Sequence, residues 1–173
     1  MIHFRPITMP ADRLLLTRIY RSTREDELAR TGWNEAEKLS FIRMQFDAQH
    51  THYQAHYPAC EYLVILQNGI AIGRLYIDTR PDSLHIIDIA MLCEHRNHGL
   101  GSRIMREILT EAERLGRKVG IYVEENNPAM PFYERLGFNK VEHQGIYHHM
   151  HWIAPCQASE ATPKIWAQAR IDN

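Results

Sequence analysis

Residues 88–102 read DIAMLCEHRNHGLGS, and the rest of the chain can be placed around this segment. Its apolar first half predicts a buried strand, and a short polar loop then leads into a helical pattern that opens near Leu100. Glycines at positions 99 and 101 let the backbone approach a ligand closely, and the first N–H groups of a helix have no partner within that helix. This corner therefore predicts an anion site that suits a phosphate or a pyrophosphate.

Two familiar phosphate-binding loops do not match this segment. The dinucleotide fingerprint requires a third small residue where Ile104 stands, and no Gly-Lys-Ser/Thr follows the glycines. The pattern that does match is Arg/Gln-x-x-Gly-x-Gly/Ala, met by Arg96, Gly99 and Gly101. It resembles the acetyl-coenzyme A loop of the GNAT superfamily of N-acetyltransferases. A strand, a glycine-rich turn and a helix also occur where a chain simply reverses, so this motif alone leaves a purely structural interpretation open.

Length and composition fit one ordinary globular domain. The chain has 173 residues, of which 45% are apolar and 24% charged, and its formal net charge is -1. The overall charge therefore does not attract the protein to nucleic acid or to anionic lipid, and we expect neither partner. Cys60, Cys93 and Cys156 are widely separated and contain no Cys-x-x-Cys, which favours structural thiols in a reducing compartment. Without a signal peptide or a membrane-spanning apolar run, the sequence predicts a cytoplasmic protein.

Periodicity and turn residues predict an α/β protein with a mixed sheet of about seven strands, mostly antiparallel, and about four helices. A helix crossover makes strands 84–92 and 118–124 parallel, which places the glycine loop at the carboxyl end of a strand. We expect one domain over residues 1–153 and a tail over 154–173. The expected elements are strand 3–7, helices 11–29 and 34–57, strands 60–66 and 70–77 around Asn68-Gly69, strand 84–92, helix 100–115, strand 118–124, a late-starting helix ending near Leu136, and strands 138–143 and 146–152.

A second segment makes the resemblance specific. Residues 126–138 read NNPAMPFYERLGF, which is similar to the second GNAT signature, an Asn followed by a small helix that carries Tyr-x-x-x-Gly-Phe. Two signatures separated by one strand and one helix are far more telling than either alone. The resemblance covers residues 2–152 and implies the GNAT fold, in which strands 84–92 and 118–124 splay apart, with acetyl-CoA as co-substrate.

The resemblance also implies where the co-substrate binds. The pantetheine arm should pair with the backbone of strand 84–92 at its end, and Asn126 or Asn127 should bind the same arm; the family spacing does not choose between these two. The diphosphate should lie on the amides that open the helix. The implied cofactor contacts are Ala90, Met91, Leu92, Arg96, Asn97, His98, Gly99, Leu100, Gly101, Ser102, Asn126, Asn127 and Tyr133.

The chemistry of acyl transfer suggests two catalytic groups. An amine that attacks a thioester must be neutral, the oxyanion needs preorganised N–H donors, and the leaving thiolate needs stabilising. Leu92, at the end of its strand, is the candidate N–H donor, and Tyr133 is the candidate acid. Full proton transfer from a phenol to a thiolate is uphill by about 2 kcal/mol at reference pKa values. We therefore expect Tyr133 to donate a hydrogen bond that tightens in the transition state.

The acceptor side is less readable. Trp33 is a candidate substrate wall, Glu25 belongs to an acidic segment over 23–37 that could attract a cationic amine, and Asp88 is a candidate contact. Each is also compatible with a packing or solvated role. The general base stays open among five residues near the strand ends, namely Asp88, Glu94, Glu124, Glu125 and His85.

Two other chemistries are not expected. Strand alternation puts His149 and His151 on one face and His148 on the other, and no cysteine or paired carboxylate completes a site, so we expect no metal. Direct attack needs no thiol, so Cys93 is not expected to carry an acetyl group.

The sequence thus predicts an N-acetyltransferase that acts in a ternary complex on a primary amine of a small molecule, peptide or protein. The alternative from another class is a catalytically silent acyl-CoA sensor of the same fold. A toxin that modifies aminoacyl-tRNA would need a basic acceptor face, against which the acidic segment 23–37 argues. A homodimer is compatible with the sequence, which does not determine the oligomeric state.

Overall fold

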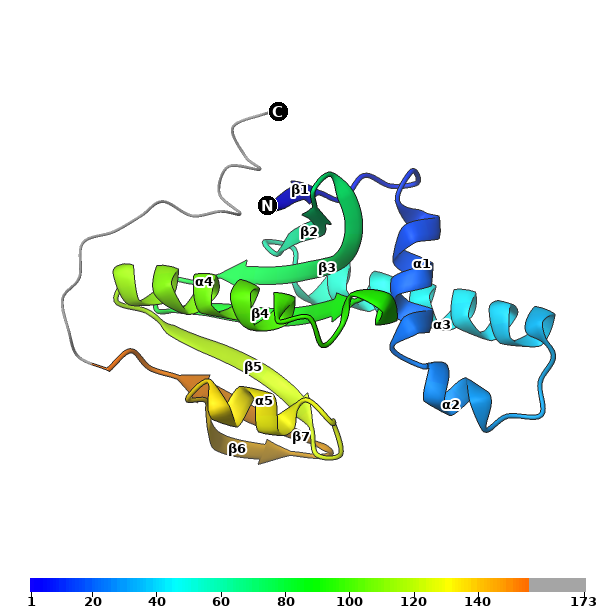
Figure 1. Ribbon diagram of the computed structural model, residues 1–173. Helices are drawn as coiled ribbons and strands as arrows, with labels where there is room; N and C mark the ends of the chain where they lie inside the picture. The colour runs from blue at the N-terminus through cyan, green and yellow to red at the C-terminus, as the bar shows by residue number, and fades with distance from the viewer. Residues whose placement is uncertain (156–173) are drawn as a thin grey trace.

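The computed structural model describes residues 1–155, and these residues form one seven-stranded sheet in the order β1-β2-β3-β4-β5-β7-β6 (Figure 1). Only β4 and β5 pair in parallel. The strands are β1 (Ile2–Pro6), β2 (Glu61–Gln67), β3 (Ile70–Thr79), β4 (Ser83–Met91), β5 (Lys118–Glu124), β6 (Asn139–Gln144) and β7 (Tyr147–Trp152). The helices are α1 (Arg13–Ser22), α2 (Glu25–Ala29), α3 (Glu35–His56), α4 (Leu100–Arg114) and α5 (Met130–Arg135), with a 3-10 turn η1 at Cys93–His95.

The mixed sheet and the parallel pair confirm the predicted fold class. The expected helix over 11–29 is instead two helices, because Thr23 ends the first one: its N–H and its hydroxyl both bond the Tyr20 carbonyl, at 3.0 and 2.7 Å. The described residues therefore hold five α-helices, where about four were expected. Most of the predicted tail, residues 156–173, lies outside the described part of the chain.

Local signals explain the other boundaries. Asn34 and Glu37 form a reciprocal capping box, which fixes the start of α3. Asn68 and Gly69 both have positive φ, as a two-residue hairpin turn between β2 and β3 requires. Pro131 lies in the first turn of α5, so that helix starts late, as expected.

The sheet opens between its two parallel strands. β4 and β5 pair over four positions, from Ser83↔Lys118 to Ile86↔Ile121, and β5 then diverges from β4 (Figure 1). The divergence begins at a β-bulge, since Tyr76 of β3 faces Asp88 while Ile77 faces Ile86, which leaves Ile87 without a partner across the strands. The bulge thus lies at the level where the pairing with β5 ends, and bulged strands bend.

Two apolar cores cover the two faces of the sheet. One lies between the sheet and α4 and α5, and includes Ile104, Ile108 and Tyr133; the other gathers α1, α2 and α3 against the end of β4, at Ala90 and Leu92. The α4 and α3 helices are on opposite sides of the strands (Figure 1). Across residues 1–155, no helix has both the length and the apolar character that a membrane crossing requires.

Candidate active site

The gap between β4 and β5 presents a free strand edge. Leu92 donates its N–H to the Ile72 carbonyl at 2.9 Å, on the side of β3. Because the direction of hydrogen bonding alternates along an antiparallel strand, the neighbouring Met91 points its N–H and C=O into the gap. The Met91 carbonyl indeed accepts from Arg96 Nε at 2.9 Å, away from β3. The assignment of Leu92 as oxyanion donor is therefore corrected: its amide is already bonded, and Met91 offers the amide that faces the gap.

The loop that leads into α4 is a cluster of free backbone donors. Gly99 is the N-cap in the left-handed conformation, with φ 74°, and Asn97 also has positive φ. Among residues 1–155, no backbone acceptor is paired with the N–H groups of residues 97–102. The first turn of α4 contains no acidic side chain. This arrangement fits the predicted anion site, since the helix dipole and the free N–H groups both favour a phosphate.

Arg96 has a different task from the rest of this loop. Its N–H bonds the Cys93 carbonyl at 3.1 Å, so its amide is not one of the free donors. Its guanidinium donates to the Met91 carbonyl and to both the carbonyl and the hydroxyl of Ser22, at 2.7 to 2.9 Å. Arg96 thus ties the loop to β4 and to the C-terminal end of α1, where a cation is favourable. The guanidinium therefore anchors the loop, and the amides that stay free for a ligand are those of residues 97–102.

Tyr133 lies on α5, inside the core that α4 covers. Its side chain packs against Phe132 and Phe138, and the residue is only 7% exposed. Burial, followed by the charge of Asp88, raises the pKa of Tyr133 to about 12. The phenol is therefore a hydrogen-bond donor over the whole usable pH range. Its hydroxyl has no hydrogen-bond partner in the described part of the chain.

Asp88 lies on the other face of β4, in a polar cluster beneath α3. Its carboxylate accepts from Arg74 Nη2 at 2.6 Å, and the same nitrogen donates to Gln49 of α3 at 2.9 Å. Arg74 is 1% exposed, and its Nε and Nη1 have no hydrogen-bond partner within residues 1–155, although its guanidinium lies over the Tyr76 ring, 5.1 Å from the centroid. Burial and then the Asp88 charge also raise the pKa of Tyr53 on α3. Asp88 therefore acts electrostatically on tyrosines from both faces of the sheet, at the level of the gap.

The two asparagines before α5 are not equivalent. Asn127 accepts the Ala129 N–H through its side-chain oxygen at 2.8 Å, so it shapes the start of the helix. Asn126 is exposed, and its side chain has no hydrogen bond in residues 1–155. The structure thus distinguishes a structural Asn127 from an available Asn126, which the sequence alone could not do.

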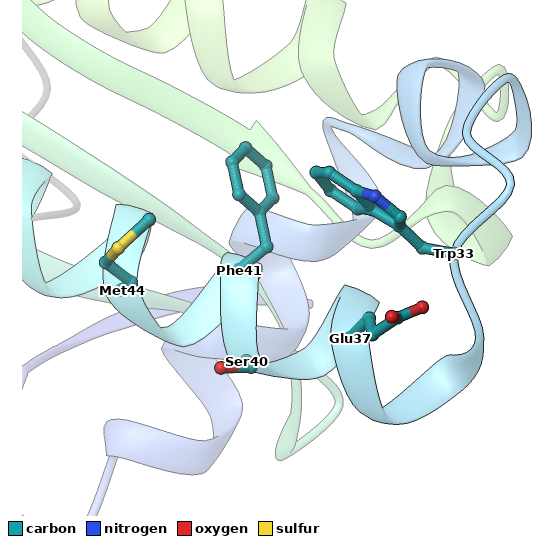
Figure 2. Close-up of a pocket in the computed structure, with 5 residues that line it drawn as sticks. All are labelled: Trp33, Glu37, Ser40, Phe41 and Met44. Atoms are coloured by element: carbon teal, nitrogen blue, oxygen red, sulfur yellow. The ribbon is translucent and has the colours of Figure 1, made fainter.

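The candidate acceptor residues are not all brought together. Trp33 follows α2, packs on Phe41 with ring centroids 5.1 Å apart, and lines a pocket of about 360 Å³ with Glu37, Ser40 and Met44 (Figure 2). Glu25 is instead paired with Arg21 at 2.9 Å on the surface of α1. Most of the acidic segment is occupied in this way: Arg21 also binds Glu35, Arg24 binds Glu27, and Glu37 caps α3. This favours the solvated-surface interpretation over attraction of a cationic amine.

The other candidates for a general base have distinct surroundings. Glu94 forms a long ion pair with Arg18 at 3.5 Å, and Glu124 accepts from the Tyr147 hydroxyl at 3.4 Å. His85 is 3% exposed, and burial lowers its pKa to about 4, so its imidazole is neutral at physiological pH. Cys93 is exposed and bonds Glu94 through its thiol at 3.3 Å.

Sequence reasoning missed three residues that shape this region, namely Ser22, Tyr53 and Arg74. An arginine within the apolar strand 70–77 was a visible signal that Arg74 is paired in the interior, since buried charges need partners. Ser22 and Tyr53 gave no such signal, because their contacts join segments far apart in the chain.

Comparisons with known proteins agree with this geometry. A sequence model of the acetyltransferase (GNAT) family matches residues 18–138. The fold and the gap define a GNAT-like α/β protein, and the chain belongs to the GNAT acetyltransferase family.

Two curated relatives share part of the sequence. The chain is 34% identical over 74 residues to the uncharacterized N-acetyltransferase CgeE of Bacillus subtilis, a match that covers 42% of this chain and 29% of that protein. It is 26% identical over 87 residues to the [ribosomal protein bS18]-alanine N-acetyltransferase of Haemophilus influenzae, covering 50% of this chain and 60% of the relative. The matched segments therefore span less than two thirds of either relative's own length.

Solved structures share the fold at low sequence identity. PaiA N-acetyltransferase from Thermoplasma acidophilum, in complex with coenzyme A, superposes with a TM-score of 0.65 at 15% identity, covering 89% of this chain and 99% of that chain. The ribosomal-protein-S18-alanine N-acetyltransferase from Escherichia coli gives a TM-score of 0.61 at 16% identity, covering 94% and 99%.

Proposed function

We propose that this protein is an acetyl-CoA dependent N-acetyltransferase, and we assign the activity to one domain over residues 1–153. The observation that carries the proposal is the gap beyond Ile86 and Ile121, where the β4 edge exposes the Met91 N–H. Free amides lie at one end of that edge, and the buried Tyr133 carries a hydroxyl without a partner in residues 1–155. A long thioester with an anionic diphosphate end suits such a site.

In this proposal each part of coenzyme A meets a different group of the chain. The amides of residues 97–102 hold the diphosphate. The gap-facing backbone of β4 pairs with the amides of the pantetheine arm, as an added strand would, and Asn126 bonds the same arm. The Met91 carbonyl is already taken by Arg96, so the Met91 N–H is left for the thioester oxygen.

The transfer then follows from these positions. A neutral amine attacks the thioester carbonyl, a C–N bond forms, and the C–S bond breaks as coenzyme A leaves as a thiolate. The Met91 N–H stabilises the oxyanion, while Tyr133 donates a hydrogen bond to the leaving sulfur. The proton that the amine releases passes to water.

We further propose that the acceptor is a primary amine of a small molecule or peptide that reaches the gap from the α3 face. The Trp33 pocket would take an apolar part of the acceptor, whereas Asp88 is already neutralised by Arg74 and keeps that buried pair in place. A relative named as an alanine N-acetyltransferase supports testing peptides with a free N-terminal alanine.

The proposal is tested with the purified full chain. Binding of coenzyme A is measured by calorimetry, and thiol release from acetyl-CoA is followed over a panel of small amines and alanine-terminated peptides. Thiol release with a matching acetylated product, identified by mass spectrometry, is the expected result. Coenzyme A binding without thiol release on any amine would support an acyl-CoA sensor instead of an enzyme. Absence of coenzyme A binding would refute both interpretations.

A further inference from the structure

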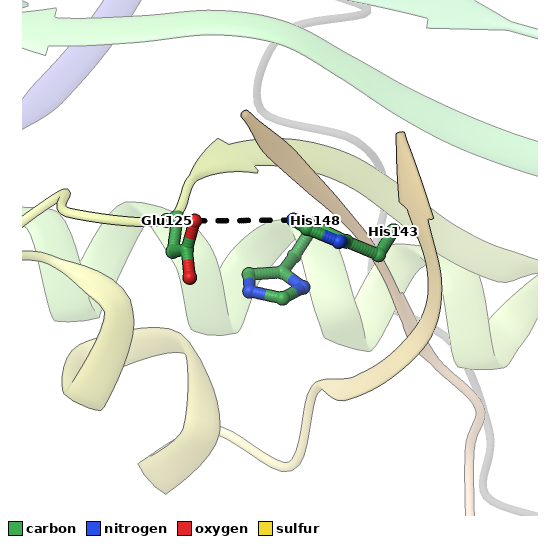
Figure 3. Close-up of side chains that lie close together, drawn as sticks. All are labelled: Glu125, His143 and His148. Atoms are coloured by element: carbon green, nitrogen blue, oxygen red, sulfur yellow. Dashed lines mark ion pairs between the residues drawn. The ribbon is translucent and has the colours of Figure 1, made fainter. Parts of the chain in front are cut away.

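A second group of side chains gathers at the C-terminal end of β5. Glu125 follows β5 directly, His143 lies on β6, and His148 lies on β7 (Figure 3). The two histidines are direct partners across the β6–β7 pair, and their rings stack with centroids 4.6 Å apart. Glu125 Oε2 lies 4.0 Å from His143 Nε2. One ligand atom from each residue lies within 4.8 Å of the other two, and residues 1–155 contain no other such group of three.

The backbone holds these three residues in place. Glu125 donates its N–H to the Ile146 carbonyl, at 2.8 Å, in the loop that joins β6 to β7. Gly145 in the same loop has φ 62°, which lets the hairpin turn tightly. Because β7 also pairs with β5 along its length, the three donors are carried by strands that are bonded to one another. Any closer approach of the ligand atoms would therefore come from side-chain rotation.

The donor set is that of a transition metal. Two imidazoles and one carboxylate are a common set for Zn²⁺, and they leave a coordination position for water. Zinc ligands at about 2.0–2.1 Å in a tetrahedron lie about 3.3 Å from one another, so the present spacing must shrink by about 1 Å. His143 and Glu125 have side chains 51% and 58% exposed, which leaves them free to rotate and open to an ion from solvent. Glu124 and Glu142, both exposed, add negative charge to these strands.

We propose that Glu125, His143 and His148 form a binding site for a single Zn²⁺ ion. The bound ion cross-links the end of β5 to the β6–β7 hairpin, beside the segment that leads to Asn126 and α5. The site therefore stiffens the wall of the gap without touching the reacting atoms. The inference stands on this cluster and does not depend on the proposed acetyl transfer.

The test is a calorimetric titration of the chelator-treated full chain with zinc chloride at neutral pH. One ion per chain is expected, together with a rise in the unfolding temperature on zinc addition. His148→Gln and Glu125→Gln should each weaken zinc binding by at least about tenfold, since even indirect supports of metal ligands cost this much when removed. Circular dichroism and the metal-free unfolding temperature check that each variant is folded.

Two other histidine pairs provide matched controls. His52 and His56 stack on α3 with centroids 4.0 Å apart, and His149 and His151 lie on β7 with their Nε2 atoms 3.1 Å apart. His52→Gln and His151→Gln should leave zinc affinity unchanged. If either control lost zinc binding while His148→Gln bound zinc as wild type does, the binding site would be assigned to that control pair and the proposal would be overturned. Absence of zinc binding to the wild-type chain would overturn it as well.

Discussion

Replacing Tyr133 by Phe tests the proposed chemistry most directly. With a pKa of about 12 against about 8.5 for a thiol, full proton transfer from this phenol to the leaving sulfur is uphill by about 5 kcal/mol. Tyr133 should therefore act as a hydrogen-bond donor to a developing anion, a contribution of about 1.5–3 kcal/mol. The variant should lose turnover by about 10- to 150-fold. Affinity for coenzyme A should change little.

The assay measures kcat, kcat/KM and coenzyme A affinity for wild type and Tyr133→Phe over a range of pH. The hydroxyl has no partner in residues 1–155, so its removal leaves no orphaned group and the free energy of unfolding should stay within about 0.5 kcal/mol of wild type. Because the raised pKa keeps the phenol protonated, wild-type kcat should show no alkaline decline from Tyr133 below about pH 10. Tyr122→Phe, at a residue 40% exposed on β5, is the matched control.

Two results would refute this reasoning. One is unchanged turnover in Tyr133→Phe when the chemical step is shown to limit the rate. The other is an alkaline decline of wild-type kcat near pH 8–9 that the substitution removes, because that decline would mean that the phenol titrates far below the pKa that its burial imposes.

Three further predictions concern the loop, the buried ion pair and a buried histidine. Gly99→Asp should weaken coenzyme A binding by at least about tenfold, because the new carboxylate repels the diphosphate and the backbone at φ 74° is strained by a side chain. Gly116→Asp is the control, since Gly116 also has positive φ, at 63°, but lies beyond the other end of α4, and it should not weaken binding. Equal coenzyme A binding by both variants would contradict the loop site. Asp88→Asn leaves the Arg74 charge unpaired and should cost about 3–5 kcal/mol of unfolding free energy, measured in urea, and an unchanged midpoint would show that the pair is not buried. Burial lowers the pKa of His85 to about 4 in the folded protein, below its unfolded value, so its contribution to stability is present above about pH 6.5 and falls by about 3 kcal/mol towards pH 4. His85→Gln should therefore reduce the dependence of the unfolding free energy on pH. An equal pH dependence in wild type and variant would exclude His85 as its source.

The elements could be predicted because their signals are local. Asn34 and Glu37 lie one helical turn apart, and their capping box starts α3 where the spacing indicated. Asn68 and Gly69 are adjacent, and the hairpin turns there. The turn at Gly99 was likewise predictable from a few neighbouring residues, and α4 begins directly after it.

The parts that could not be predicted depend on register. The direction of backbone hydrogen bonding alternates from residue to residue along β4, and this decides whether Leu92 or Met91 offers an amide to the gap. No local sequence pattern predicts which of the two it is. The pairing of His143 with His148, and the approach of Glu125 to them, depend on how two strands and a loop align. Alternation along one strand correctly separates His148 from His149, yet it says nothing about the residue on the neighbouring strand.

The extra residue Ile87 in β4 determines which face of the sheet the residues after it meet. Leu84 and Ile86 face the core beneath α4, and regular alternation would send Asp88 into that same hydrocarbon layer. The extra residue reverses the phase of the strand, so the carboxylate meets Arg74 instead and Ile89 packs into the aliphatic layer. Deleting one residue here would exchange charge for hydrocarbon on both sides of the sheet at once. At this position the length of the strand, more than the identity of the Ile87 side chain, decides which face each following residue meets.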